Sequence, residues 1–244
     1  MREMFEITMA GPAKNALGSE MLQFLLDRLT EADGRPVLLT GTGDAFSAGL
    51  DLKEVARLDR DQMLAFLRLL ERSICALFLY PGPTVAAVNG HAIAGGCVMT
   101  LCCDRRVIAR NPKIKMGLNE VALGVRFPPR TLAVVRSRIP RRHVEQVILG
   151  ARLFDPESAL RVGLVDEIAD DVLSVARARL SALAAHPDDG YAITKHDLRG
   201  TAQDLCSDDA LERWLQEAVT VWTSTSLKEK VAAMFARQPA KPTP

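Results

Sequence analysis

Two short apolar runs, each followed by a loop of small residues, place the strongest constraint on how this chain can fold. The runs occupy 36–40 and 84–89, and the loops occupy 41–49 and 90–96. A short apolar run bounded by turn residues is typical of a buried strand, and helical periodicity follows each loop. The repeated order of strand, loop and helix predicts an α/β architecture with largely buried strands.

Further elements follow from periodicity and from helix start signals. Strands are predicted at 105–109 and 165–168. Ser19 is a suitable N-cap, and Asp155-Pro156 reads as a cap followed by proline in the first helical turn. Helices are predicted over 19–32, 59–80, 97–103, 130–138, 141–149, 155–162, 171–185, 207–222 and 226–237. The 244 residues fit one large domain or two small ones.

Composition and charge exclude several classes of protein. Hydrophobic residues make up 48% and charged residues 25%, which is ordinary for a globular domain. The net charge is only +1, so no global field draws the chain to nucleic acid or to an anionic membrane. The sequence contains no apolar run long enough to span a bilayer and no basic, then apolar, leader. We expect a cytoplasmic protein without nucleic-acid or membrane partners.

The cysteines agree with that expectation. They are odd in number and show no zinc or CxxC spacing, so we expect reduced, buried thiols and no metal site. The five positions are Cys75, Cys97, Cys102, Cys103 and Cys206.

The first loop does not fit common nucleotide-binding or nucleophile motifs. Phe46 stands where a dinucleotide fingerprint requires its third glycine, and no lysine completes a phosphate-binding loop. Ser47 lies outside any G-x-S-x-G elbow, so we do not expect it to act as a nucleophile.

The two loops make better chemical sense together. Ser47-Ala48-Gly49 and Ala94-Gly95-Gly96 each follow a buried strand and precede a helical stretch. Small residues let the main chain approach a ligand, and N–H groups at a helix start carry partial positive charge. The pair could therefore aim two amides at one carbonyl oxygen as an oxyanion hole. Two tight strand–helix turns would produce the same pattern, and spacing alone does not separate these readings.

Glu120 is the third candidate. It lies among apolar neighbours in the segment 116–124. Such a carboxyl is either exposed on a loop or desolvated, and desolvation would raise its pKa and make it a better base near neutral pH. Its neighbours alone favour the exposed position.

These segments, taken in order, resemble the crotonase, or enoyl-CoA hydratase/isomerase, superfamily. The matching stretches lie at 14–17, 46–54, 83–97, 103–105, 117–120, 160–167 and 227–235. The resemblance implies a spiral of stacked ββα units over 1–186 and a helical region over 187–244 that covers the site and builds a homotrimer or a dimer of trimers. It also implies an acyl-CoA substrate and no cofactor, since coenzyme A is part of the substrate.

The resemblance further assigns roles to individual positions. Glu120 would be the catalytic base, and the amides of Ala48 and Gly95 would bind the thioester oxygen. The implied substrate-binding residues are Ala48, Gly49, Leu50, Asp51, Gly95, Val98 and Asn119.

Two departures from the hydratase pattern favour one branch of the family. Hydratases carry an additional glutamate where this chain has Val98, and a glycine-rich segment where this chain reads 124–130. A single base suffices to move a double bond, so the sequence favours a Δ3,Δ2-enoyl-CoA isomerase in fatty acid or related acyl-CoA metabolism. A hydratase, another crotonase-type enzyme on an unusual thioester, and a non-catalytic acyl-CoA-binding subunit are the alternatives.

The remaining polar candidates have structural interpretations beside the functional ones. Asp51 fits a helix cap better than a ligand contact, and His91 is read as a packing residue. Arg126 and Arg130 could pair with CoA phosphates, with a substrate carboxylate or across a subunit contact. Weak candidates for the CoA phosphates are Lys14 and Lys53, while Trp214 and Trp222 are expected in the core or at an interface.

Overall fold

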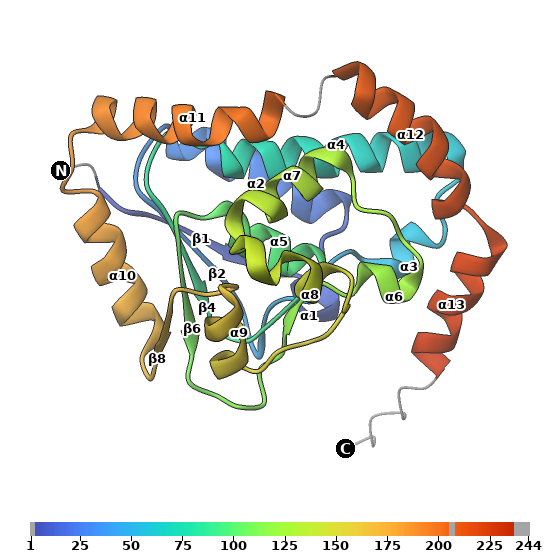
Figure 1. Cartoon of the computed structure of the whole chain (residues 1–244), viewed down its shortest axis with the longest axis horizontal. Coiled ribbons are helices and arrows are strands. Elements are labelled where there is room, and N and C mark those ends of the chain that lie inside the picture. The colour runs from blue at the N-terminus through green and yellow to red at the C-terminus, as the bar shows by residue number, and fades with distance from the viewer. Residues whose placement is uncertain (1–2, 205–207, 237–244) are drawn as a thin grey trace.

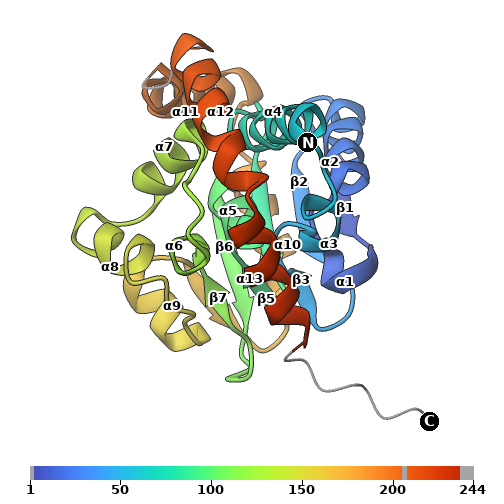
Figure 2. The same ribbon diagram turned by 90° about the vertical axis from the view of Figure 1, so that its right-hand side faces the viewer.

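The computed structural model describes residues 3–204 and 208–236, and its strands form two sheets with parallel pairing within each; Figure 1 labels the larger sheet and Figure 2 the strands of the smaller one. The larger sheet has the strand order β1-β2-β4-β6-β8 and the smaller one the order β3-β5-β7. The large-sheet strands are β1 (Phe5–Met9), β2 (Val37–Gly41), β4 (Thr84–Val88), β6 (Arg105–Ala109) and β8 (Glu167–Ala169). The small-sheet strands are β3 (Ala45–Ser47), β5 (His91–Ile93) and β7 (Met116–Gly117).

The chain visits the two sheets alternately and then forms helices, which is the predicted spiral of ββα units. Thus β2 leads to β3, β4 to β5 and β6 to β7. The helices up to this point are α1 (Pro12–Asn15), α2 (Ser19–Ala32), α3 (Leu52–Val55), α4 (Arg60–Phe78) and α5 (Gly95–Cys102). Those that follow are α6 (Glu120–Leu123), α7 (Pro129–Arg138), η1 (Arg141–His143), α8 (Val144–Ile148), α9 (Pro156–Val162) and α10 (Val172–Leu183).

Both faces of the large sheet are buried, which explains its nearly unbroken apolar runs. On β2, Val37 and Leu39 pack into the main core. Leu38, between them, packs instead with Leu180 of α10 in a second cluster on the opposite face. Neighbouring strand residues point to opposite faces, so α10 must cover the side that the other helices leave open.

Three C-terminal helices complete the described chain: α11 (Asp188–Asp204), α12 (Asp208–Trp222) and α13 (Thr225–Ala236). Figure 2 shows α13 descending in front of α5, β3 and β5. None of the helices formed by the described residues is long and apolar enough to cross a bilayer. The boundary between the spiral and the C-terminal helical region, expected near residue 187, stays a prediction.

Several local expectations are corrected. Gly18, not Ser19, is the N-cap of α2, because the Ser19 hydroxyl instead donates to Glu54 across the loop (2.5 Å). No helix was predicted across 188–204, where α11 forms. The thiols of Cys97, Cys102 and Cys103 are buried as expected, Cys75 is only partly buried, and Cys206 lies outside the described residues.

Candidate active site

A cavity of about 450 Å³ lies where the two small-residue loops, the segment 115–131 and the C-terminal helices meet. Its wall contains most of the predicted site residues: Ala48, Leu50, Gly95, Val98, Asn119 and Glu120. Most of the remaining wall is apolar, and it comes from α3, α4, α6, the two last helices and the segments at 93–94, 125–128 and 153. The apolar residues there are Leu52, Val55, Leu70, Ile74, Ile93, Ala94, Leu123, Val125, Phe127, Pro128, Leu153, Trp222, Leu227 and Met234.

The pairing of β3 with β5 brings the two loops together. The strands are parallel and in register at Ala45 and His91, so both loops leave the same edge of the small sheet. Gly49 (φ +88°) lies against the second loop: an added Cβ would stand 2.7 Å from the Ile93 oxygen and 3.3 Å from the Gly95 nitrogen. Only glycine combines this conformation with such a close approach, so Gly49 sets the distance between the loops.

The second loop presents its amide at the start of α5. The first hydrogen bond of that helix runs from the Val98 N–H to the Ala94 carbonyl (3.0 Å), which leaves the Gly95 amide outside the helical ladder. Ala94 adopts φ 49° and ψ −121°, a region that alanine rarely occupies. Its own amide donates to the Gly117 oxygen at 2.8 Å. Strain of this kind costs roughly 1–3 kcal/mol and concentrates at functional sites.

The first loop amide is already engaged. The Ala48 N–H donates to the Lys14 carbonyl oxygen at 3.0 Å. Lys14 lies in a left-handed turn with Ala13 and Asn15. The Asn15 side chain secures that turn by donating to the main-chain oxygens of residues 42 and 45, each at 2.9 Å. Ala48 therefore lines the cavity, but its amide points at a protein acceptor.

Glu120 begins α6 and has a buried oxygen. Neither its Oε2 atom nor the Oδ1 atom of Asn119 has a hydrogen-bond partner among the described residues. Burial raises the pKa of the Glu120 carboxyl to about 7, against a smaller lowering by the amides of Asn119 and Glu120. The structure thus fits the desolvated carboxyl and not the exposed one that the neighbours alone favoured.

A second buried carboxyl, Glu71 of α4, lies behind the cavity wall. It is 1% exposed and accepts hydrogen bonds from the Thr131 hydroxyl and, at 3.2 Å, from the Arg130 amide. Burial raises its pKa to about 7. Because these donors stand at the start of α7, whose N-cap is Pro128, Glu71 serves as the acceptor that this helix lacks.

Two predicted binding residues have other roles. Gly49 and Asp51 are absent from the cavity wall. The Asp51 carboxylate caps α3 by accepting from the amides of Lys53 and Glu54 at 2.9 and 3.2 Å. The capping interpretation of Asp51 is thus confirmed, and Lys53 is likewise absent from the wall.

The other polar candidates divide in the same way. Lys14 and Arg126 line the cavity and form ion pairs with Asp44 (2.8 Å) and Glu217 (3.1 Å). Arg130 is absent from the wall and pairs with Asp208 of α12.

Sequence reasoning missed three contributors to the wall. His91, read as packing, lines the cavity, and its Nδ1 accepts from the amide of Lys115, which also lines it (3.0 Å). Trp222 was expected in the core or at an interface. Trp222 is buried and its side chain lines the cavity. Its indole nitrogen has no partner among the described residues. The apolar spacing of α12 gave no signal of this role.

The ββα spiral and a cavity with paired loops define a crotonase-fold protein, and the sequence comparison agrees. Residues 2–238 match the family described as enoyl-CoA hydratase/isomerase, and the chain belongs to that family.

Its relatives include both isomerases and hydratases. It is 34% identical over 200 residues to the mouse (Mus musculus) mitochondrial enoyl-CoA delta isomerase 1, covering 79% of this chain and 69% of that protein. The crystal structure of human mitochondrial delta3-delta2-enoyl-CoA isomerase superposes with a TM-score of 0.88 at 29% identity, over 96% of this chain and 93% of that one. The crystal structure of enoyl-CoA hydratase from Bacillus halodurans superposes with a TM-score of 0.82 at 26% identity, over 96% of this chain and 97% of that one.

Proposed function

We propose that this enzyme isomerises 3-enoyl-CoA to 2-enoyl-CoA with Glu120 as its single acid–base group. One observation carries the proposal: among the described residues Glu120 is the only carboxyl on the cavity wall, and its buried Oε2 atom has no partner there. A pKa of about 7 suits a group that must take up a proton and then release it near neutral pH.

The reaction needs two proton transfers and no external reactant. Glu120 takes a proton from C2, and the C2–H electron pair forms a dienolate whose charge rests on the thioester oxygen. The protonated Glu120 then delivers that proton to C4 as the double bond moves to C2–C3. The two carboxyl states differ by one proton, so the enzyme returns to its starting form.

The oxygen charge requires donors that are already in place. The Gly95 amide lies at the start of α5, where the helix dipole adds favourable potential. For Ala48 to contribute, the thioester oxygen must share its N–H with the Lys14 carbonyl or displace that carbonyl. A shared, three-centre hydrogen bond is common in proteins.

The apolar wall favours isomerisation over hydration. Val98 is buried on α5 and faces the cavity, where it offers no group to activate a water. Excluding water also protects a reactive dienolate from side reactions. Hydration stays the second candidate, because a hydratase of known structure shares this fold closely.

The cavity also has a cationic region suited to coenzyme A. Lys14 and Lys115 line it alongside the small sheet, and point charges of this kind bind phosphate groups. Trimer assembly and a cytoplasmic location stay predictions; the curated isomerase relatives carry a mitochondrial name.

The deciding experiment offers the enzyme a 3-enoyl-CoA and a 2-enoyl-CoA in parallel. We expect the first to yield a conjugated thioester, followed by its ultraviolet absorbance, and the second to be hydrated far more slowly. Hydration as fast as isomerisation would establish the alternative function. Tight acyl-CoA binding without either reaction would indicate a non-catalytic subunit.

A further inference from the structure

A second cavity, of about 680 Å³, shares no lining residue with the first. It lies where α11 passes β6 and the end of α7. Its polar wall residues are Asp104, Arg105, Ser137, Arg138, His186, Tyr191, Thr194, Lys195 and Arg199.

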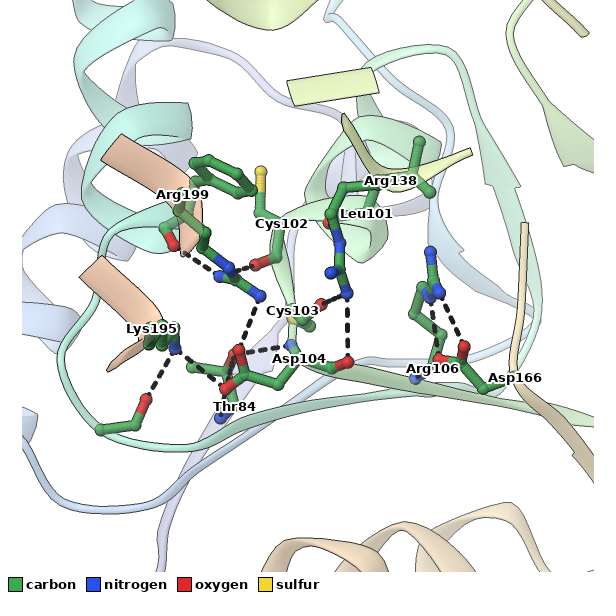
Figure 3. A network of polar contacts seen from close by, with 12 residues as sticks. Thr84, Leu101, Cys102, Cys103, Asp104, Arg106, Arg138, Asp166, Lys195 and Arg199 are labelled. Atoms are coloured by element: carbon green, nitrogen blue, oxygen red, sulfur yellow. Dashed lines mark hydrogen bonds and ion pairs between the residues drawn. The ribbon is translucent and has the colours of Figure 1, made fainter. Parts of the chain in front are cut away.

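Three cations gather at this cavity around one carboxylate. Figure 3 shows Lys195, Arg199 and Arg138 converging on the Asp104 segment. The Asp104 carboxylate accepts from Lys195 Nζ at 2.9 Å and from Arg199 Nη2 at 2.6 Å. Arg138 donates to main-chain oxygens instead, through Nε to Leu101 and through Nη2 to Cys103 (3.1 and 2.9 Å).

Helix ends supply part of the missing negative charge. Arg199 Nη1 donates to the carbonyls of Phe78 and Cys102, the last residues of α4 and α5. A helix C-terminus is equivalent to roughly half a negative charge. Asp104 and these two helix ends offset part of the positive charge of the three cations. Lys195 and Arg199 are 7% and 6% exposed, so solvent screens the remaining charge poorly.

Arg138 keeps donor capacity for a ligand at this wall. Its Nε and Nη2 atoms donate to main-chain oxygens, and its Nη1 atom, which is not fully buried, bonds no acceptor among the described residues. Burial first, and the neighbouring guanidinium groups after it, lower the pKa of Arg138 to about 10. An anion in the cavity would accept from Nη1 and reduce the repulsion between the neighbouring guanidinium groups.

We propose that this cavity binds a compact oxyanion, a phosphate or carboxylate group, through Arg138, Lys195 and Arg199. A planar guanidinium matches the oxygens of such a group in a fork, and an ammonium adds a point charge. The hydroxyls of Ser137 and Thr194 are further donors on the wall, and Arg105 and His186 place additional basic groups there. Among the lining residues Asp104 is the single acid, and its oxygens are occupied by the pairs described above.

Gly190 offers a test that leaves the cations untouched. It lines the cavity within α11, and an added Cβ would meet no atom within 4 Å. Gly190→Glu introduces a competing carboxylate at the wall. Gly190→Ala is the matched control, since both changes remove a helical glycine and raise helix propensity alike.

Binding is measured by isothermal titration calorimetry with inorganic phosphate and, separately, with acetate. The enzyme is first saturated with coenzyme A, which occupies the phosphate subsites of the active site, and ionic strength is held constant. We expect saturable binding of at least one anion to the wild type and to Gly190→Ala, and an affinity at least tenfold lower for Gly190→Glu. The two arms show whether phosphate or carboxylate is preferred.

Two results would overturn the proposal: no saturable binding of either anion to the wild type, or equal binding by Gly190→Glu. Circular dichroism and unchanged turnover of acyl-CoA verify that the variants are folded. If Gly190→Glu does not fold, Leu198→Glu, which lies on the same wall and is exposed, provides the competing charge, with Leu198→Gln as its control.

Discussion

Replacing Glu120 with glutamine should separate catalysis from stability. The raised pKa means that the folded protein binds this proton more tightly than the unfolded chain does. Between pH 4.5 and about 7 the folded state therefore holds the extra proton, and its free energy of unfolding falls as pH rises. The pKa change from 4.5 to about 7 corresponds to roughly 3 kcal/mol in the free energy of unfolding, which the wild type loses above pH 7.

Glutamine carries no such titration. The free energy of unfolding of Glu120→Gln, taken relative to that of the wild type, should therefore increase by about 3 kcal/mol when the pH is raised from 4 to 8.5. Urea denaturation at both pH values would measure this change. Its isomerase rate should fall by about 10²–10⁴-fold, the usual contribution of a general acid–base group. The wild-type rate should rise as pH increases through about 7, because the first step needs the carboxylate.

Glu71→Gln is the matched control. Glu71 has the same direction of pKa shift and the same cause, but it is absent from the cavity wall. We expect a similar gain in stability at high pH with isomerase activity largely kept. Retention of activity by Glu120→Gln, or a stability difference that does not change with pH, would refute the assignment of a desolvated catalytic carboxyl.

Further predictions concern the loops and the buried ion pairs. Gly49→Ala should destabilise the protein by about 1–3 kcal/mol in a denaturation measurement, because alanine is strained at φ +88° and its Cβ would press on the Ile93 oxygen. The same change should lower kcat in a rate measurement, because it separates the two loops. Asp104→Asn should cost about 3–5 kcal/mol in a urea titration, since Lys195 and Arg199 would keep their buried charges without a counter-ion. Val98→Glu should slow isomerisation, measured by conjugated-thioester absorbance, because it introduces a second carboxyl into an apolar wall.

Local pattern was enough for much of the fold. The helix over 19–32 and the strand over 105–109 form with the predicted bounds, because their apolar periodicity reports directly which face is buried. The omitted helix α11 shows the limit of this reasoning. Its apolar residues Ile193 and Leu198 are exposed, while Lys195 and Arg199 are buried. The apolar pattern of this helix therefore predicts the wrong buried face.

The amino-acid sequence by itself determined the α/β rhythm, the two small-residue loops and the short list that contained Glu120, since these depend on neighbours along the chain. Only the tertiary structure decided that Gly49 and Gly95 lie in contact, that the Ala48 amide is held by Lys14, and that Glu120 lacks a partner for its buried oxygen. These properties depend on strand pairing and on groups remote in sequence. Burial and electrostatic environment, which set the pKa of a carboxyl, arise only when those groups are brought together.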